Sequence, residues 1–189
     1  MLKLKKLKEK KAQEAAQGLS GKPQISAAIM RMTKDLNDMQ LPPHVQLNLP
    51  DPQDIMHFEI SIKPDEGYYK GAIFPFQFKV NHEYPHEPPK VKCTKKLYHP
   101  NIDLQGNVCL NILRDDWKPV LSINSIVHGL CFLFDDPNPD DPLNKDAAEM
   151  LAANPHQFER NVKMSLQGGR ISGESYAYDW LKFYKIVVF

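Results

Sequence analysis

The sequence predicts an α+β domain in which one helix precedes an antiparallel meander of about four strands and further helices follow a long loop. The first observation is a helical spacing of apolar residues, at Ile25, Ile29, Met32, Leu36 and Met39, which is typical of one face of an amphipathic helix. The second is the alternation of apolar and polar residues across residues 56–63 and 74–80, as expected for strands that are buried on one face. The third is the return of helical spacing only after residue 122. Strands that are followed by helices in this way indicate the α+β class.

Length and composition fit one domain with tails. The chain has 189 residues, of which 42% are hydrophobic, and its formal net charge of +1 gives no reason to expect nucleic acid as a partner. Its three cysteines, Cys93, Cys109 and Cys131, lack the spacing of a metal site, which favours a reducing intracellular compartment over a disulfide framework. No apolar run approaches the ~20 residues of a membrane span, and the basic N-terminus differs from a secretory signal. We therefore expect neither a membrane partner nor a bound metal.

The first helix and the strands follow one another closely in the sequence. The helix face opposite the apolar residues carries Arg31, Lys34 and Asp38. This polar face is expected to meet solvent, and the prolines of residues 41–43 end the helix. Residues 65–67 form the expected turn between the two alternating strands, and a third strand continues the pattern through Val91 and Cys93. Cys93 is therefore expected to point inward as an inert core thiol.

The stretch that follows the strands, residues 97–120, is rich in turn formers and contains Cys109. A loop of this length in a compact domain is usually functional. A cysteine between turn residues is expected to be exposed, and an exposed thiol can act as a nucleophile. The nearby His99 precedes Pro100, which restricts its backbone and favours a turn, whereas the amide of Asn101 can donate a hydrogen bond to an oxyanion at an acyl carbon. These residues predict a thiol that carries an acyl group.

Beyond this loop, Ser122 is expected to cap the central buried helix. The wide apolar face of that helix consists of Ile123, Ile126, Val127, Leu130, Leu133 and Phe134. Cys131 lies on the same helix and is interpreted as a core thiol. An acidic, proline-rich loop follows over residues 135–142, and two further helices are predicted at residues 144–151 and after Asn154-Pro155. Gly168-Gly169 ends the last of them, and the aromatic-rich residues 170–189 have no assigned role.

These motifs, in this order, resemble those of the ubiquitin-conjugating enzyme family. Three segments of the chain are similar to the core signature of the family: His99-Pro100-Asn101, Cys109-Leu110 and Trp117-Lys118-Pro119. Residues 84–90 (YPHEPPK) are similar to the YPxxPP loop of the family, and residues 136–142 (DPNPDDP) to its PNPxDP segment. The resemblance implies the family fold, with an N-terminal helix, a four-stranded antiparallel meander, an active-site loop and then three helices. Within the family, NIDLQGNVCLNILRDDWKPVLSINSI is most similar to the branch that conjugates the neddylation modifier.

The resemblance also implies roles for the residues near the cysteine. A partner enzyme would pass the C-terminal acyl group of a ubiquitin-like modifier to the Cys109 sulfur, and a substrate lysine would then attack this thioester. Because a lysine amine has a pKa of about 10.4 in solution, it is mostly protonated at pH 7, and Asp141 is the candidate that positions it and assists loss of its proton. Asn101 would stabilise the oxyanion or fix the loop that does so, and both roles remain open. His99 and Pro100 would be structural, and no cofactor is expected.

Ligase contacts are implied at two loops, residues 84–90 and 117–120. The family places RING-type ligases there, and His86, Trp117 and Pro119 are the candidate contacts. The expected substrates are cullins, and the expected location is the cytoplasm and the nucleus.

The N-terminal segment, residues 1–24, is expected to be a flexible docking extension. Its candidate contacts with a heterodimeric activating enzyme are Met1, Leu2, Leu4 and Leu7. The modified first residue would bind a ligase cofactor, and Lys5 stands where the family has an aromatic residue. Residues 25–169 would then be the catalytic core and residues 170–189 a C-terminal tail.

Three alternative functions remain to be tested. A non-catalytic binding module of the same fold needs no thiol at the active position, so Cys109 argues against it. A cysteine peptidase needs a histidine base within reach of that thiol. The third alternative is a conjugating enzyme that carries ubiquitin instead of the neddylation modifier.

Overall fold

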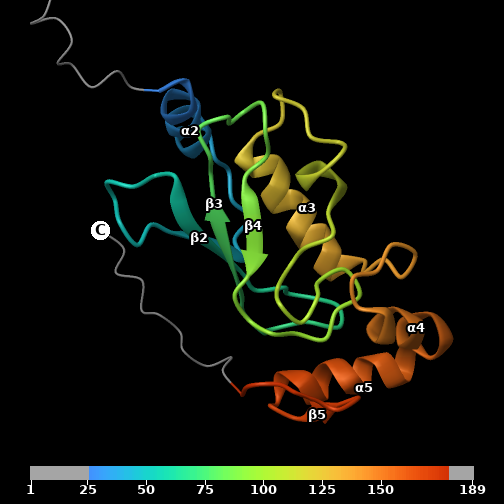
Figure 1. The fold of residues 1–189 in the computed structure, drawn as a ribbon. Helices are drawn as coiled ribbons and strands as arrows, with labels where there is room; N and C mark the ends of the chain where they lie inside the picture. Colours follow the sequence, from blue (N-terminus) through green and yellow to red (C-terminus); the bar gives the residue numbers. More distant parts are fainter. Residues whose placement is uncertain (1–25, 179–189) are drawn as a thin grey trace, which may run out of the picture.

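The computed structural model describes residues 26–178 and has the predicted order of elements (Figure 1). The helices are α2 (Ala27–Asn37), α3 (Ile123–Asp135), α4 (Lys145–Ala153) and α5 (Pro155–Leu166), with a short 3-10 helix η1 (Asn111–Leu113). The strands are β1 (Val45–Asn48), β2 (His57–Ile62), β3 (Phe74–Lys79), β4 (Lys90–Cys93), β5 (Arg170–Ile171) and β6 (Glu174–Ser175). No helix in this part of the chain has the length and apolar character of a membrane span.

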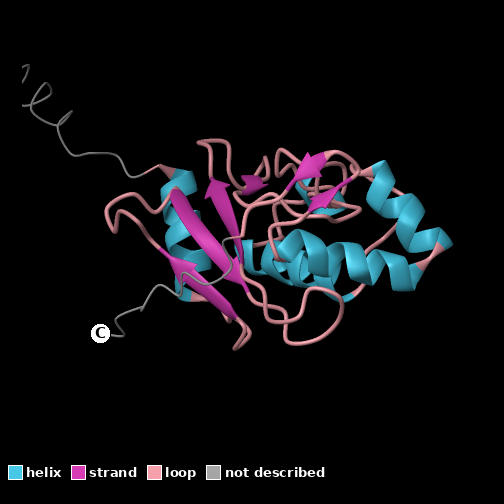
Figure 2. Ribbon diagram, turned by 90° about the horizontal axis from the view of Figure 1, so that it is seen from below, coloured by secondary structure: helices cyan, strands magenta, loops and turns pink. Residues whose placement is uncertain are grey.

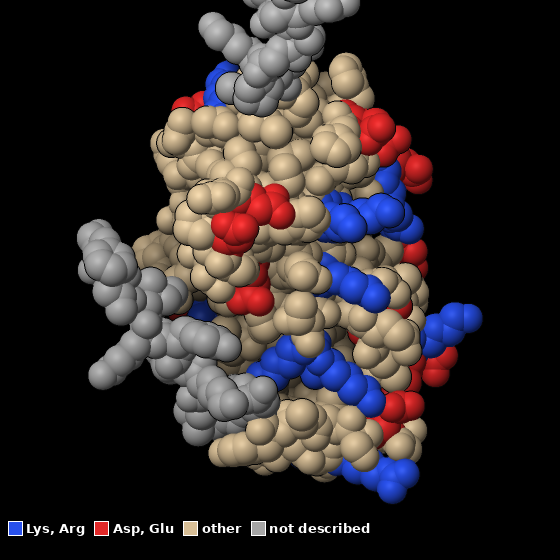
Figure 3. Space-filling view, turned by 60° about the vertical axis from the view of Figure 1, so that its left-hand side comes forward, with Lys and Arg blue, Asp and Glu red and all other residues tan. Residues whose placement is uncertain are grey.

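Strands β1 to β4 form one antiparallel sheet in sequence order, which confirms the predicted meander. The register pairs Ile60 with Phe76 and Phe58 with Phe78, so the apolar members of the alternating pattern share one face of the sheet and are fully buried there. The other face carries polar residues, and both basic and acidic side chains occur on the side of the molecule that Figure 3 shows. Strand β1, which the sequence pattern did not predict, pairs with β2 at one edge.

Helix α3 is the central buried helix that the sequence predicts. Its apolar face is buried, including Cys131, and Phe134 stacks on Phe74 of the sheet at 4.6 Å between ring centroids. Ser122 is the N-cap residue, and its N–H donates to the Ser125 hydroxyl. Helices α4 and α5 lie at the end of the molecule away from α2 (Figures 1 and 2). Both begin at the predicted positions, because Asn144 and Asn154 accept hydrogen bonds from the first turns.

The buried face of α2 differs in part from the face that the spacing of apolar residues predicts. The fully buried residues of α2 are Ala28, Met32 and Asp35, so an aspartate lies at the centre of the buried face. Arg31, which the spacing placed on the solvent face, has a side chain that is only 22% exposed and forms an ion pair with Asp35 at 2.8 Å. Apolar periodicity cannot detect such a pair, because it treats every charged residue as solvent-facing.

The segment after α5 packs on the domain as far as the structure describes it. Gly168 has a φ of 77° after the last helical turn, in agreement with the predicted glycine cap. Strands β5 and β6 then form a short hairpin that buries Ile171 and Tyr176 against the core, and Lys96 pairs with Glu174 at 2.6 Å. The β5–β6 hairpin therefore lies against the core, and the division of the chain at residue 169 stays a prediction. Residues 179–189 lie outside the described part of the chain.

Candidate active site

Cys109 lies at the end of a tight loop that the sequence fixes locally. The Asp103 carboxylate accepts hydrogen bonds from the N–H groups of Gln105 and Asn107, which closes the turn. Gly106 has a φ of 83°, and a side chain there would collide with the Cys93 carbonyl. The Cys109 N–H then donates to the Asn101 carbonyl at 2.8 Å. The main chain thus holds the cysteine beside the predicted amide residue.

The Cys109 thiol is enclosed by two charged side chains, which corrects the prediction that this cysteine is exposed. Only 6% of the residue is accessible. Its Sγ lies 2.9 Å from Asp141 Oδ2 and 2.8 Å from an Arg114 Nη2, and the guanidinium pairs with the same carboxylate oxygen at 3.0 Å. Turn residues on both sides of a cysteine do not expose it when a second loop, here residues 136–142, folds over it.

Asp141 and Arg114 have opposite effects on the pKa of the Cys109 thiol. Burial and the hydrogen bond to Asp141 raise the pKa of the Cys109 thiol to about 11, although the Arg114 charge acts in the other direction. The same thiol contact and Arg114 hold the pKa of Asp141 below its usual value. The thiol is therefore mostly protonated at neutral pH, and Asp141 is ionised.

Asn101 is buried and holds the loop that carries Asp141. Its Nδ2 donates to the carbonyls of Asn138 at 2.8 Å and Asp141 at 3.3 Å, and its Oδ1 accepts from the Asn138 N–H at 2.9 Å. Both of the roles predicted for Asn101 require it to be near Cys109. In this structure the amide forms all three of these hydrogen bonds with the loop, which is the geometry of the loop-fixing role.

His99 is held by hydrogen bonds at both of its ring nitrogens, and its structural role stays a prediction. Its ring is fully buried, its Nδ1 accepts from the Asn101 N–H at 2.9 Å, and its Nε2 donates to the Leu133 carbonyl at 2.8 Å. Burial lowers the pKa of His99 to about 4, so the ring is neutral at pH 7. Pro100 also ties the site together, because its carbonyl accepts from the N–H groups of Leu143 and Asn144. With both ring nitrogens engaged, His99 cannot serve as the base that a peptidase needs.

The predicted ligase contacts lie in two loops that touch each other. Trp117 Nε1 donates to the Pro85 carbonyl at 2.8 Å, and the Trp117 and Tyr84 rings lie 5.9 Å apart. His86 and Pro119 are exposed. The predicted docking residues Met1, Leu2, Leu4 and Leu7 lie outside the described residues.

Sequence reasoning missed Arg114, although it is the third member of the group at the thiol. Its signal is weak, since one basic residue five positions after the cysteine in a loop with two aspartates resembles ordinary surface charge. Across residues 26–178, no cluster of histidine, cysteine or carboxylate side chains could hold a metal ion.

The fold and the thiol site together indicate a protein that carries an acyl group on a cysteine. Comparison of the chain with known proteins identifies its family. The family model described as "Ubiquitin-conjugating enzyme" matches residues 31–166, and the chain belongs to this family. The solved structure of S. cerevisiae Ubc12 superposes with a TM-score of 0.78 at 47% identity, covering 93% of this chain and 97% of that chain.

Two curated relatives extend the comparison along the sequence. The NEDD8-conjugating enzyme UBC12 of Yarrowia lipolytica is 54% identical and covers 93% of this chain and 97% of its own length. The Nedd8-conjugating enzyme UbcE2M of Drosophila melanogaster is also 54% identical, over 93% of this chain and 96% of its own. The predicted family, its fold and the resemblance to the neddylation branch are confirmed. The roles of the individual site residues remain predictions.

The opposing charges at the thiol predict how Cys109 reacts with iodoacetamide. Because the carboxylate raises the thiol pKa and the guanidinium lowers it, Asp141→Asn should speed alkylation at pH 7 and Arg114→Gln should slow it, each by about tenfold for every unit of pKa change. In the wild type, the rate should keep rising from pH 7 to pH 9, since the pKa lies above that range. Mass spectrometry of the Cys109 peptide measures this rate.

Asp140→Asn is the matched control for this experiment, because Asp140 is an exposed neighbour that has no contact with the thiol. It should leave the alkylation rate unchanged. A rate that reaches its plateau below pH 9 would contradict the raised pKa, and equal effects of Asp140→Asn and Asp141→Asn would reduce the effect to general surface charge.

Proposed function

We propose that this chain accepts a NEDD8-type modifier from its activating enzyme as a thioester on Cys109 and transfers it to a substrate lysine. The observation that carries the proposal is the contact of the Cys109 thiol with the Asp141 carboxylate at 2.9 Å. It places an acidic group at the atom where the acyl group would be carried, in a chain that is similar to NEDD8-conjugating enzymes over 93% of its length.

In the charging step, the Cys109 sulfur attacks the acyl carbon of the modifier, which is held as a thioester on the activating enzyme. A new carbon–sulfur bond forms, the thiolate of the activating enzyme leaves, and that thiolate takes up the proton that the Cys109 thiol gives up. The thiol must lose its proton for this attack, and Arg114 stabilises the resulting thiolate because its Nη2 lies 2.8 Å from Sγ. Because burial and the Asp141 hydrogen bond raise the pKa of Cys109 to about 11, only a small fraction of the thiol is ionised at neutral pH before a partner binds.

In the discharge step, a lysine amine attacks the thioester on Cys109, and the Cys109 thiolate leaves as the isopeptide bond forms. A thioester sulfur carries no proton, so charging frees the Asp141 oxygen that accepts from the thiol. That oxygen is then available to the incoming lysine. Once the thiol hydrogen bond is lost, Arg114 is the partner that still lowers the pKa of Asp141, so we expect the carboxylate to be a weak base that holds the attacking nitrogen more effectively than it removes the proton.

The proposal extends to partners and location. The heterodimeric activating enzyme supplies the ATP chemistry and docks on residues 1–24, with Met1, Leu2, Leu4 and Leu7 as contacts. A RING-type ligase binds the loops that contain His86 and Pro119, a ligase cofactor binds the modified first residue, and cullins provide the lysine. The reducing compartment that the three unpaired cysteines favour supports a cytoplasmic and nuclear location.

One charging experiment tests the proposed function. The protein is incubated with ATP and either the NEDD8-type modifier or ubiquitin, each with its own activating enzyme, and reductant-sensitive adducts are separated by electrophoresis. We expect an adduct with the NEDD8-type modifier and none with ubiquitin. An adduct with ubiquitin alone would favour the ubiquitin carrier, and no adduct with either would favour the non-catalytic module.

The N-terminal segment can be tested in the same assay. Deleting residues 1–22, or changing Leu4 and Leu7 to alanine, should slow charging about tenfold or more, since two leucines that the activating enzyme covers would contribute more than the 1.4 kcal/mol that corresponds to this factor. Alanine at Lys3, Lys5 and Lys6 is the matched control and should matter less, because exposed charges are screened at physiological salt. Equal rates for the full-length and truncated chains would remove the docking role.

A further inference from the structure

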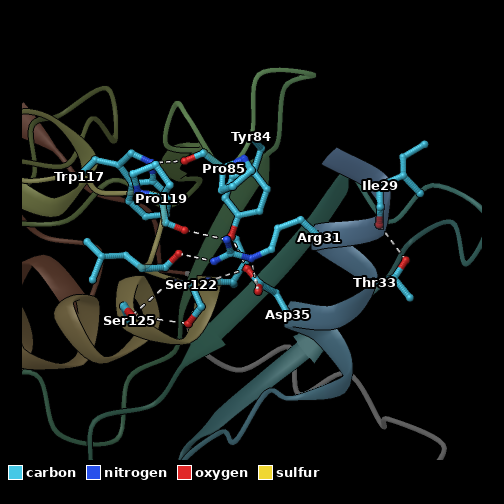
Figure 4. A network of polar contacts seen from close by, with 12 residues as sticks. Ile29, Arg31, Thr33, Asp35, Tyr84, Pro85, Trp117, Pro119, Ser122 and Ser125 are labelled. Carbon is cyan, nitrogen blue, oxygen red and sulfur yellow. Dashed lines mark hydrogen bonds and ion pairs between the residues drawn. The ribbon is translucent and has the colours of Figure 1, made fainter. Parts of the chain in front are cut away.

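One arginine of α2 binds the main chain of the loop that precedes α3. Arg31 Nη1 donates to the Pro119 carbonyl at 2.7 Å, and Arg31 Nη2 donates to the Leu121 carbonyl at 2.6 Å (Figure 4). These carbonyls lie 88 and 90 residues away in the sequence from the arginine. A planar guanidinium can hold two acceptors in a fixed geometry, which a lysine ammonium cannot reproduce. The backbone on both sides of Val120 is thus anchored to α2.

The guanidinium is itself held by a buried carboxylate. Arg31 Nε donates to Asp35 Oδ1 at 2.8 Å, and only 6% of Asp35 is accessible. Asp35 Oδ2 accepts from the Tyr84 hydroxyl and from the Ile123 N–H at 3.4 Å. One aspartate therefore joins α2 to the start of α3 and to the loop of residues 84–90. A buried carboxylate is tolerated only where its partners satisfy it in this way.

The two loops that the resemblance assigns to ligase contacts are both tied to this cluster. Tyr84 reaches Asp35 from one loop, and Trp117 bridges to that loop through its bond to the Pro85 carbonyl. The Arg31 guanidinium lies 5.6 Å from the centre of the Tyr84 ring, close enough for a cation–π contact. Figure 4 shows these side chains converging between α2 and the two loops.

The anchored segment presents an apolar side chain to solvent. Val120 lies between the two carbonyls that Arg31 binds, and 84% of it is exposed. A valine in this position contributes little to the stability of the domain, because almost none of its apolar surface is removed from water. The same apolar surface contributes to the free energy of binding when a partner covers it.

We propose that Arg31 and Asp35 are positioning residues that hold residues 119–121 in the geometry that a RING-type ligase recognises. This inference rests on the proposed function, which assigns the ligase to these loops. The physical reason is preorganisation: a loop that is already fixed loses less conformational freedom when the partner binds. The effect should therefore appear in the affinity for the ligase and not in the chemistry at Cys109.

The experiment measures discharge of the Cys109 thioester to lysine at rising concentrations of a RING-type ligase. For Arg31→Gln, the half-saturating ligase concentration should rise about tenfold, as expected when ordering of one loop is added to the cost of binding. The rate without ligase and the rate at saturating ligase should both stay unchanged. Arg31→Lys keeps the charge but not the two-carbonyl geometry, so its shift should lie between those of the wild type and Arg31→Gln.

Lys34→Gln is the matched control, because Lys34 is an exposed cation one turn along the same helix. It should leave the half-saturating concentration unchanged. In addition, amide hydrogen exchange of residues 120–122 should be faster in Arg31→Gln than in Lys34→Gln, which reports the loop geometry without any ligase. This second measurement also shows whether Arg31→Gln keeps the fold elsewhere.

Three results would overturn the inference. An unchanged half-saturating concentration in Arg31→Gln, with a ligase that accelerates the wild type, would remove the role of Arg31 and leave the proposed function intact. Equal shifts in Arg31→Gln and Lys34→Gln would show an effect of net charge alone. A ligase that does not accelerate the wild type would overturn the ligase contact itself, and the positioning role with it.

Discussion

Replacing Cys109 by alanine should abolish charging with the modifier. Among the described thiols, only that of Cys109 contacts both a carboxylate and a guanidinium group. Cys109→Ser should be more informative, since its hydroxyl can accept the acyl group as an ester. An alkoxide is a poorer leaving group than a thiolate, so this ester should persist under reducing conditions and fail to discharge to lysine. Electrophoresis with and without a thiol reductant distinguishes the two kinds of adduct.

The other two cysteines provide the control for this result. Cys93 and Cys131 are buried in the core, and burial raises the pKa of the Cys93 thiol to about 12 and that of Cys131 to about 11. Cys93→Ser and Cys131→Ser should therefore charge normally once any loss of stability is allowed for. A modifier adduct on Cys109→Ala would show that the acyl group is carried elsewhere.

Local patterns were sufficient to predict most of the fold. The alternation in β2 and β3 and the apolar face of α3 arise from burial of one side of each element, and this burial leaves a periodic signal in the sequence. Strand β1 has only four residues and the β5–β6 hairpin only two residues in each strand. The strands of the hairpin are too short to show a period, so their pairing depends on tertiary contacts that the sequence pattern does not show. Strand β1 is as short as β4, but it does not continue an alternation that earlier strands have begun.

The contacts of the candidate site were predictable only through motifs. Cys109 and Asp141 are 32 residues apart, and Arg31 and Leu121 are 90 apart. No local rule brings such pairs together, and the enclosure of Cys109 and the inward position of Arg31 were therefore both missed. The resemblance to the family located Asp141 and Asn101, because a motif retains a spatial relation that periodicity cannot express.

Asn101→Ala should slow discharge of the thioester to lysine while charging of Cys109 proceeds. The loss should be about 100- to 1000-fold if the amide donates to the oxyanion, and no larger than that of Asp141→Ala if the amide only holds the loop that carries Asp141. Charging should survive because Cys109 is held by the main-chain carbonyl of residue 101, which alanine keeps. The variant should also be less stable by about 1–3 kcal/mol, since the Asn138 N–H loses its acceptor. Single-turnover discharge to free lysine measures the rate, and urea unfolding measures the stability.

A double-mutant cycle with Asp141→Ala separates the two roles that the sequence left open. If Asn101 acts by holding the loop, its three hydrogen bonds to residues 138 and 141 serve to place Asp141. Asn101→Ala should then slow discharge very little once Asp141 is already alanine. If Asn101 instead donates directly to the oxyanion, the two losses should multiply. Asn107→Ala, which removes an exposed hydrogen bond to Asp103 in the same loop, is the control and should discharge at nearly the wild-type rate. We expect the non-additive result, because both donations of the Asn101 amide are directed at loop carbonyls in the uncharged enzyme.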